Sequence, residues 1–293
     1  MSIARLSVVF LLTLMKPGEP QPAALVFSLA GHATLEAPSE TRRPVHFFDR
    51  LVAGSTVEVG PASRLAVAFR SGRRYELAAG AKAKIGKNDL EARSGAVRAL
   101  KTVPPLPRLS PIAAEDRPGP KAGAVRVRAE RIAGLYPFNG AAALAGATSL
   151  HFDPVEGGKT YRVEVHDRRG SAVFEAETRS PLVALPAELL KPGARYRWTV
   201  RTSERAGPVA RATADFVTLS TRMAEAREAL RKALTADGRG DSLALLAEVD
   251  WCLGLYAEAR EELRSAVQAS PKDTLLAEHL AEREQQMAYL QSP

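Results

Sequence analysis

The C-terminal part of the chain contains an internal repeat, which restricts the folds open to that region more than any other feature of the sequence. The stretch Ala224–Leu234 recurs as Ala257–Val267, with eight of eleven positions identical and a spacing of 33 residues. Repeats of this length form helical hairpins that bury their apolar faces against one another. Roughly one and a half repeats are present, whereas about three are needed for an array that is stable alone. We therefore expect these helices to pack on the rest of the chain or on a partner.

Upstream of the repeat, the apolar residues alternate instead of following a helical period. Tyr161–Asp167 and Arg195–Thr202 alternate apolar and polar side chains, the pattern of strands with one buried and one solvated face. Further strands are predicted at 25–29, 56–59, 64–69, 75–77, 125–132, 149–152, 171–178 and 212–219. Turn residues separate these strands at intervals of roughly 8–12 residues, which is typical of all-β domains.

Six prolines between Thr102 and Gly123 divide the strands into two groups. Proline cannot donate to a sheet ladder and favours extended geometry, so residues 102–124 are predicted to form a semi-rigid linker. The expected fold is multidomain and mainly β. It has one β domain at 24–101, a second at 125–220 and a helical region at 221–293.

The net charge of +8 is unevenly distributed along the chain. The β-rich part is basic, whereas residues 221–293 contain 9 Lys and Arg against 13 Asp and Glu. The basic residues alternate with apolar ones along the strands and are not interleaved with aromatic residues that could stack on bases. They therefore indicate solvated strand faces and no nucleic-acid partner.

Residues that could perform chemistry are scattered. The five histidines have no metal-type spacing, Cys252 is the single cysteine, and no nucleophile stands in a motif that would pair it with a base. The histidines are His32, His46, His151, His166 and His279. A site assembled in space from distant histidines is the alternative. The sequence predicts a protein that is not an enzyme and has no catalytic, cofactor-binding or metal-binding residues.

The first 23 residues have the pattern of an export signal. Arg5 precedes a run of about ten mostly apolar residues, and Ala23 and Ala24 are small residues where cleavage could occur. The run is much shorter than the ~20 residues that cross a bilayer, so peripheral membrane contact or none is expected. A first buried strand or a misassigned start codon would also explain it. The signal predicts a periplasmic or secreted protein of the cell envelope.

Three short motifs follow one another in residues 24–101. They are Asp49-Arg-Leu-Val-Ala-Gly54, Thr56-Val-Glu-Val-Gly60 and Ser63-Arg-Leu-Ala-Val-Ala-Phe69. In this order they resemble the FecR-type domain of bacterial envelope proteins. Ser71-Gly72 stands where that family usually has Asp-Gly, and Ala81 stands where it usually has Ser or Thr. The resemblance implies an all-β domain that works by contact with other molecules.

The second β region carries the tokens Phe152-Asp-Pro-Val-Glu-Gly-Gly158 and Leu190-Lys-Pro-Gly193, the latter followed by Tyr196 and Trp198. These resemble fibronectin type III modules, which are immunoglobulin-like β-sandwiches. The resemblance implies that Tyr196 forms a tyrosine corner, in which the hydroxyl returns to upstream backbone. Phe152 and Trp198 are expected in the core.

The second copy of the repeat resembles a tetratricopeptide repeat. The residues at that family's spacing are Gly254, Tyr256, Ala259, Leu263, Ala266 and Pro271. Asp250 departs from the pattern, because an apolar residue is more usual there. If this region binds a partner peptide or helix in its groove, the contact is expected on the concave face near Tyr256 and Arg260.

Together these features predict a non-catalytic, exported envelope protein that acts as a binding or scaffold module through protein–protein contacts. Two other hypotheses stay open. One is a regulator of transmembrane, sigma-factor-type signalling, which the FecR resemblance implies. The other is a cell-wall polysaccharide-binding protein, although only 6% of the residues are aromatic and sugar platforms are usually aromatic.

Overall fold

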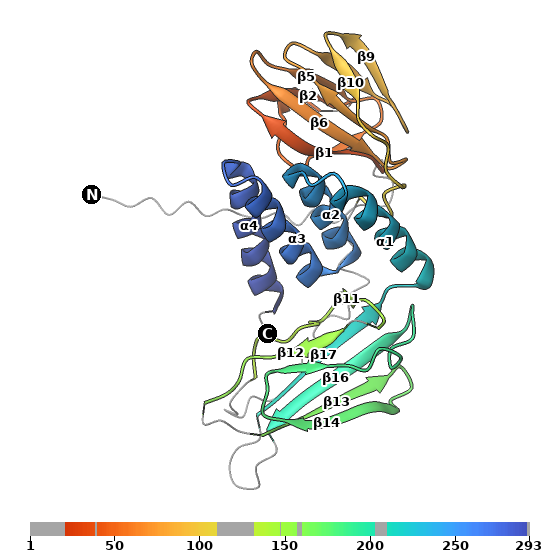
Figure 1. The fold of residues 1–293 in the computed structure, drawn as a ribbon, viewed down its shortest axis with the longest axis vertical. Coiled ribbons are helices and arrows are strands. Elements are labelled where there is room, and N and C mark those ends of the chain that lie inside the picture. The colour runs from red at the N-terminus through yellow and green to blue at the C-terminus, as the bar shows by residue number, and fades with distance from the viewer. Residues whose placement is uncertain are drawn as a thin grey trace, which may run out of the picture.

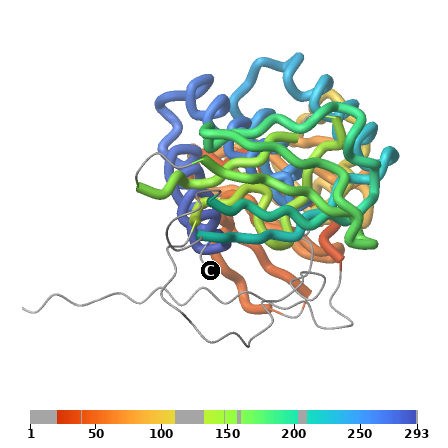
Figure 2. Tube along the Cα trace, turned by 90° about the horizontal axis from the view of Figure 1, so that it is seen from below, coloured from red at the N-terminus to blue at the C-terminus, as the bar shows by residue number. Residues whose placement is uncertain are grey.

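The computed structural model describes residues 21–38, 40–109, 132–146, 148–156, 160–202 and 210–291. Two β-sandwich domains lie at opposite ends of the molecule, and four helices lie between them (Figure 1). The helices come last in the sequence but occupy the middle in space. Viewed along the long axis, the strands of the second β domain lie in front of the helices and of the first β domain (Figure 2).

The first β domain consists of two five-stranded sheets whose strand pairs are all antiparallel. One sheet has the order β10-β7-β6-β1-β4, with β10 at Val97–Ala99, β7 at Arg74–Leu77, β6 at Arg64–Phe69, β1 at Pro22–Ala30 and β4 at Arg50–Val52. The other has the order β3-β2-β5-β8-β9, with β3 at Arg43–Pro44, β2 at Ala33–Glu36, β5 at Thr56–Val59, β8 at Lys82–Ile85 and β9 at Leu90–Ser94.

Strand β1 is apolar on both faces because both faces are buried. Val26 points into the core between the two sheets, whereas Leu25 and Phe27 on the other face pack against the helices. A strand covered on both sides needs a near-continuous apolar run instead of alternation. The neighbouring strand β6 repeats the arrangement, with Ala66 and Ala68 on the helix side.

The second β domain packs a five-stranded sheet against a two-stranded one. The larger sheet has the order β11-β17-β16-β13-β14, with β11 at Ala141–Ala143, β17 at Arg211–Thr218, β16 at Arg195–Thr202, β13 at Tyr161–Asp167 and β14 at Ala172–Thr178. The smaller sheet pairs β12 at Ser149–His151 with β15 at Leu182–Ala184. The fold class expected from the sequence, β-sandwich domains followed by a helical segment, is confirmed.

The aromatic residues expected in this domain's core are there. Phe152 and Trp198 are fully buried, and the indole Nε1 of Trp198 donates to the carbonyl oxygen of Pro137 at 2.8 Å. The hydroxyl of Tyr196 accepts a hydrogen bond from the backbone N–H of Lys191 at 2.7 Å. This is the upstream backbone contact that the resemblance implied for Tyr196.

The helical segment comprises α1 at Thr221–Thr235, α2 at Gly240–Leu253, α3 at Tyr256–Ala269 and α4 at Thr274–Gln291. The two copies of the 33-residue repeat lie on α1 and α3, which both contact α2. Twelve of the fourteen residues of α2 are buried. Gly254 ends α2 in the left-handed region, with φ 82°, as glycine does after many helices. No helix in the described ranges has both the length and the apolarity needed to cross a bilayer.

The start of the proline-rich segment is packed, which differs from the predicted linker. Val103, Leu106 and Leu109 are buried and join the apolar cluster between the first β domain and the helices. The backbone N–H of Val103 donates to the carbonyl oxygen of Gly72 at 3.0 Å, and that of Leu106 donates to the carbonyl oxygen of Arg70 at 3.0 Å. Apolar residues between the prolines explain the difference. The rest of the predicted linker, and all but the last residue of the strand predicted at 125–132, lie outside the described residues.

The expected export signal at 1–23 lies almost entirely outside the described residues. Its last three residues are described, and β1 begins at the second of them, Pro22, which pairs with Val52. Ala24 is fully buried in the same strand. The start of the first β domain therefore lies slightly upstream of the boundary predicted at residue 24.

Candidate functional site

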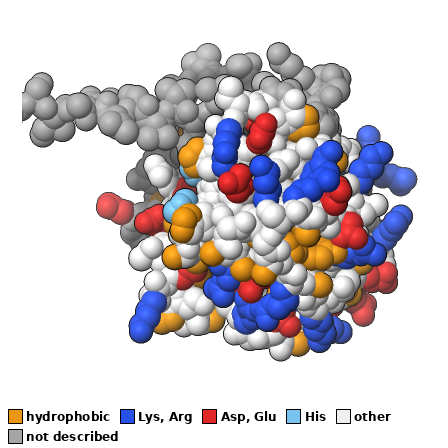
Figure 3. Space-filling view, turned by 90° about the horizontal axis from the view of Figure 1, so that it is seen from above, with side chains coloured by type: hydrophobic (Ala, Val, Ile, Leu, Met, Phe, Trp, Pro, Cys, Tyr) orange, Lys and Arg blue, Asp and Glu red, His pale blue; other side chains and the backbone are white. Residues whose placement is uncertain are grey.

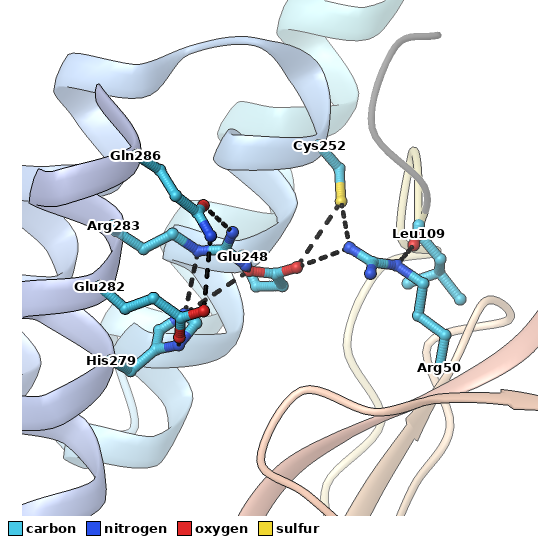
Figure 4. A network of polar contacts seen from close by, with 8 residues as sticks. All are labelled: Arg50, Leu109, Glu248, Cys252, His279, Glu282, Arg283 and Gln286. Carbon is cyan, nitrogen blue, oxygen red and sulfur yellow. Dashed lines mark hydrogen bonds and ion pairs between the residues drawn. The ribbon is translucent and has the colours of Figure 1, made fainter. Parts of the chain in front are cut away.

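The most concentrated group of buried charges lies where the helices meet the first β domain. Glu248 projects from the middle of α2, and its side chain is 1% exposed. Its carboxylate pairs with Arg283 of α4 at 2.6 Å and with Arg50 of β4 at 2.9 Å, and His279 Nε2 lies 3.8 Å away. Figure 4 shows Glu248 between the arginine of the β domain and the residues of α4. One carboxylate thus connects three elements.

The arginines hold this carboxylate in its charged form. Burial alone would raise the pKa of Glu248, but Arg283, His279 and Arg50 outweigh burial and bring the pKa to about 2. A second bond fixes Arg50, because its Nε donates to the carbonyl oxygen of Leu109 at 2.7 Å. The buried carboxylate is tolerated while its cationic partners are in place, whereas removal of a partner leaves part of its charge uncompensated.

Cys252 lies one helical turn from Glu248, and its thiol is close to the same carboxylate. The Sγ–Oε1 distance is 4.0 Å, and Arg50 Nη2 lies 3.7 Å from Sγ. Burial, followed by the charge of Glu248, raises the pKa of Cys252 to about 12. A thiol that stays protonated at neutral pH is a poor nucleophile. Cys252 therefore serves as a packed, weakly polar member of the network.

A second buried ion pair explains the residue that departs from the tetratricopeptide pattern. Asp250 of α2 is fully buried and receives two bonds from Arg227 of α1, with Nη2–Oδ2 at 2.6 Å and Nε–Oδ1 at 3.0 Å. Burial raises the pKa of Asp250 to about 6, although Arg227 opposes this shift. Arg227 stands at the position in the first repeat copy that Arg260 occupies in the second. The polar residue thus ties α1 to α2.

Aromatic side chains connect the helices to the second β domain. Tyr256 of α3 stacks on Phe138, with ring centroids 5.0 Å apart, and meets Trp251 of α2 edge-on at 4.7 Å. The hydroxyl of Tyr136 accepts a hydrogen bond from the backbone N–H of Ala257 at 3.1 Å. The backbone N–H of Ala142, in β11, donates to the carbonyl oxygen of Gly254 at 2.9 Å. These contacts bury the start of α3 against the second domain.

The two interfaces are joined through one side chain. The guanidinium of Arg283, which pairs with Glu248, also lies over the ring of Trp251 at 4.5 Å from its centroid. Cation–π contacts of this kind are worth about 0.5–2 kcal/mol. An unbroken series of contacts therefore leads from Arg50 in the first β domain to Phe138 beside the second. We call this series the interdomain path; its residues are Arg50, Glu248, Arg283, Trp251, Tyr256 and Phe138.

The prediction that Tyr256 contacts an external partner is wrong. Its side chain is 2% exposed, and the aromatic ring of Phe138, from the same chain, occupies the face where a partner was expected. Arg260 is half-buried, and its Nε lies 3.4 Å from a carboxylate oxygen of Glu261. Arg260 contributes no hydrogen bond or ion pair to the interdomain path. The helices did need a cover, as the incomplete repeat predicted, and the two β domains provide it.

The sequence reasoning missed Glu248 and Asp250 as members of a site. A signal was present, since both carboxylates interrupt the otherwise apolar stretch from Leu243 to Leu253. A charged residue on a helix that is apolar all round must be paired in the interior. Their partners could not be identified in this way, because Arg50 and Arg227 lie on other elements.

The outer surface of the first β domain carries more basic than acidic side chains. Viewed from that end, Lys and Arg side chains are spread over the surface with Asp and Glu among them (Figure 3). Arg98 pairs with Glu76 at 3.1 Å, and Lys82 lies 3.5 Å from Glu58. Such exposed pairs contribute little to stability. In the part of the chain that the structure covers, no three metal-ligating side chains lie together.

No protein-family model and no curated protein matches this chain. Among solved structures, it is similar to CopC from Methylosinus trichosporium OB3b, with 18% identity over 31% of this chain and 94% of that chain, at a TM-score of 0.25. It is also similar to chicken CNTN1 FN1–FN3 domains, with 10% identity over 69% of this chain and 64% of that one, at 0.23. A third similar structure is β-D-glucuronidase from Dictyoglomus thermophilum, with 12% identity over 68% of this chain and 44% of that chain, at a TM-score of 0.22. The chain therefore spans less than half of that enzyme's length, and no functional statement follows from these likenesses.

Proposed function

We propose that this protein is a non-catalytic scaffold of the bacterial cell envelope, in which the helices hold two β-sandwich domains in one fixed arrangement. Partners would bind to the surfaces that the β domains expose. The observation that carries the proposal is the position of Glu248, whose buried carboxylate pairs at once with β4 and α4. Burial of a carboxylate is costly unless its cationic partners stay in place, which favours a junction that keeps Arg50 and Arg283 beside Glu248.

Each of the three parts resembles a family whose members act by binding other molecules. The order of motifs in the first domain resembles FecR-type domains, and the Tyr196–Lys191 bond supports a fibronectin type III-like second domain. The 33-residue repeat on α1 and α3 supports a tetratricopeptide-like helical segment. Phe138 of the same chain covers Tyr256, where the partner contact was expected, so here the segment would serve as an internal clamp.

The rigid arrangement is tested by small-angle X-ray scattering of the purified protein and of the Arg50→Glu variant. We expect the wild type to fit one arrangement, and the variant to have a larger radius of gyration because its new carboxylate repels Glu248. Equal radii of gyration for the two proteins would contradict the proposal that the Arg50–Glu248 contact holds the domains in one arrangement.

The compartment is tested by cell fractionation and mass spectrometry of the mature N-terminus. We expect an envelope fraction with a new N-terminus at or before Pro22, because cleavage downstream would remove residues of β1 that pair with Val52. An intact Met1 in the cytoplasm would contradict export, while an intact Met1 in the membrane fraction would favour the signalling alternative.

A further inference from the structure

The open end of the second β-sandwich contains a cavity of about 550 Å³. It lies between the turn that joins β13 to β14 and the segment that leads into β16. Its walls include the partly buried apolar side chains of Val173, Leu189, Ala194 and Val217. Pockets that hold small molecules have volumes of roughly 300–1,000 Å³. The cavity is therefore large enough for a small organic ligand.

The mouth of this cavity is cationic. Arg168, Arg169, Lys191 and Arg195 line it and are exposed. None of their side chains forms an ion pair or hydrogen bond with another residue in the described ranges. The single acidic residue of the lining is Asp167. Its Oδ1 already accepts the backbone N–H groups of Arg169 at 2.9 Å and Ser171 at 3.0 Å, which hold the turn.

Three other arginines of the same sheet are paired. Arg162 contacts Glu164 at 2.9 Å, Arg197 contacts Asp215 at 2.8 Å, and Arg201 contacts Glu164 at 3.2 Å. Carboxylates among the described residues thus pair with these three arginines but not with the cations at the cavity. Neighbouring like charges repel, and an anion among them removes that repulsion.

We propose that this cavity binds a small organic dianion of the phosphate monoester class. Arginine side chains donate two parallel hydrogen bonds to phosphate oxygens, and lysine adds a point charge. The apolar part of the ligand would lie against Val173 and Leu189. Four cations against one engaged carboxylate favour a dianion over a monoanion. This inference rests on the second domain alone and is independent of the compartment and of the scaffold role.

Isothermal titration calorimetry of the full chain with phenyl phosphate and with inorganic phosphate tests it. We expect saturable binding of phenyl phosphate, with at least ~3-fold higher affinity than inorganic phosphate because the ring buries apolar surface. The K191E/R195E variant should bind phenyl phosphate at least ~10-fold more weakly. The matched control is Arg179→Glu. Arg179 is also an exposed arginine of this domain, forms no ion pair with the residues that the structure describes, and lies outside the cavity. Its affinity should stay within about twofold of wild type.

A second variant keeps the test informative if the first one misfolds. R168A/R169A changes only an exposed turn, and circular dichroism should show native strand content while the affinity for phenyl phosphate falls. Sedimentation with phosphatidylcholine vesicles containing phosphatidic acid distinguishes the source of the phosphate. Binding to these vesicles that K191E/R195E abolishes would identify a lipid headgroup, whereas binding of phenyl phosphate alone would identify a soluble ligand. The inference is overturned if the wild type binds neither probe, or if Arg179→Glu weakens binding as much as K191E/R195E.

Discussion

Arg50 and Glu248 lie 198 residues apart in the chain, and the partly exposed guanidinium of Arg50 meets the buried carboxylate of Glu248 at 2.9 Å. The arginine belongs to a strand of the first β domain and the carboxylate to the central helix of the C-terminal segment. The same carboxylate binds Arg283, which in turn covers Trp251 beside the second β domain. The relative position of the three parts is therefore fixed by specific contacts and by an apolar cluster that crosses from β1 to α2.

Arg50→Met should weaken the contact between the first β domain and the helices. The apolar replacement retains most of the buried volume, and Arg283 and His279 remain beside Glu248, so we expect a loss of about 1–3 kcal/mol in the free energy of unfolding. Urea unfolding followed by circular dichroism measures this. Arg93→Met is the control, because Arg93 pairs only with Glu91 at the exposed surface, and it should change stability by less than about 0.5 kcal/mol.

Stability should fall in acid through the pKa of Glu248. Its pKa is about 2 in the folded protein, against an ordinary value of 4.5, so the charged form contributes stability above about pH 4.5 that is lost as pH falls towards 2. The contribution at neutral pH is about 3 kcal/mol. Unfolding measured from pH 7 to pH 2 should show this loss in wild type and in Glu188→Gln, whose side chain is exposed. Glu248→Gln should be less stable at pH 7, and its free energy of unfolding should fall less steeply between pH 7 and pH 2. A fall parallel to that of the wild type would show that Glu248 is not the group responsible.

Tyr256→Ala should destabilise the junction with the second β domain by about 3–5 kcal/mol, as expected when a large buried aromatic is truncated. Tyr256 loses its stack with Phe138 and its edge contact with Trp251. Tyr289→Ala is the matched control, since Tyr289 is 72% exposed. Equal unfolding temperatures for the two variants would show that Tyr256 contributes no more to stability than an exposed tyrosine.

The Arg227–Asp250 pair should behave as a unit. Arg227→Met or Asp250→Leu alone leaves one buried charge unpaired, which costs about 3–5 kcal/mol. The double variant replaces both with apolar side chains and should recover most of the loss, because no buried charge remains. A double-mutant cycle by urea unfolding measures this. Additive losses would mean that the two residues do not interact in solution.

Gly72→Ala tests how residues 103 and 104 pack on the first domain. A Cβ at Gly72 would lie 2.0 Å from the carbonyl oxygen of Val103, and Gly72 has φ +85°. Gly170 has nearly the same φ, +84°, but nothing within 4 Å of its added Cβ. Gly170→Ala should therefore report backbone strain alone, about 1–2 kcal/mol. The additional destabilisation of Gly72→Ala, measured by thermal unfolding, should then come from displacing Val103.

Local patterns predicted the elements well where a pattern existed. The alternation at Tyr161–Asp167 and the apolar run at Arg64–Phe69 both correspond to strands with the expected bounds. Strand β9, Leu90–Ser94, carries charged and exposed residues at the edge of its sheet, so no alternation marked it. Edge strands of this kind are held by backbone bonds that composition does not reveal.

The arrangement of the domains could not be predicted, because its determinants are far apart in the chain. Phe27 reads as an ordinary strand residue until the opposite face of its strand is known to be buried too. The position of Glu248 in an apolar helix predicts a buried ion pair but does not identify the partner. The resemblance to tetratricopeptide repeats also misled, since it suggested a groove open to others where Phe138 already lies.

The middle position of the helices has a consequence for how the protein is made. Both β domains leave the ribosome before α2, so the cover that the central helix gives to Leu25 and Phe27 is added only after both domains have been synthesised. A product that stops before α2 would lack the helix side of this apolar cluster and would expose more of the sheet face. The helices that cover the first β domain are therefore translated after the domain that they cover.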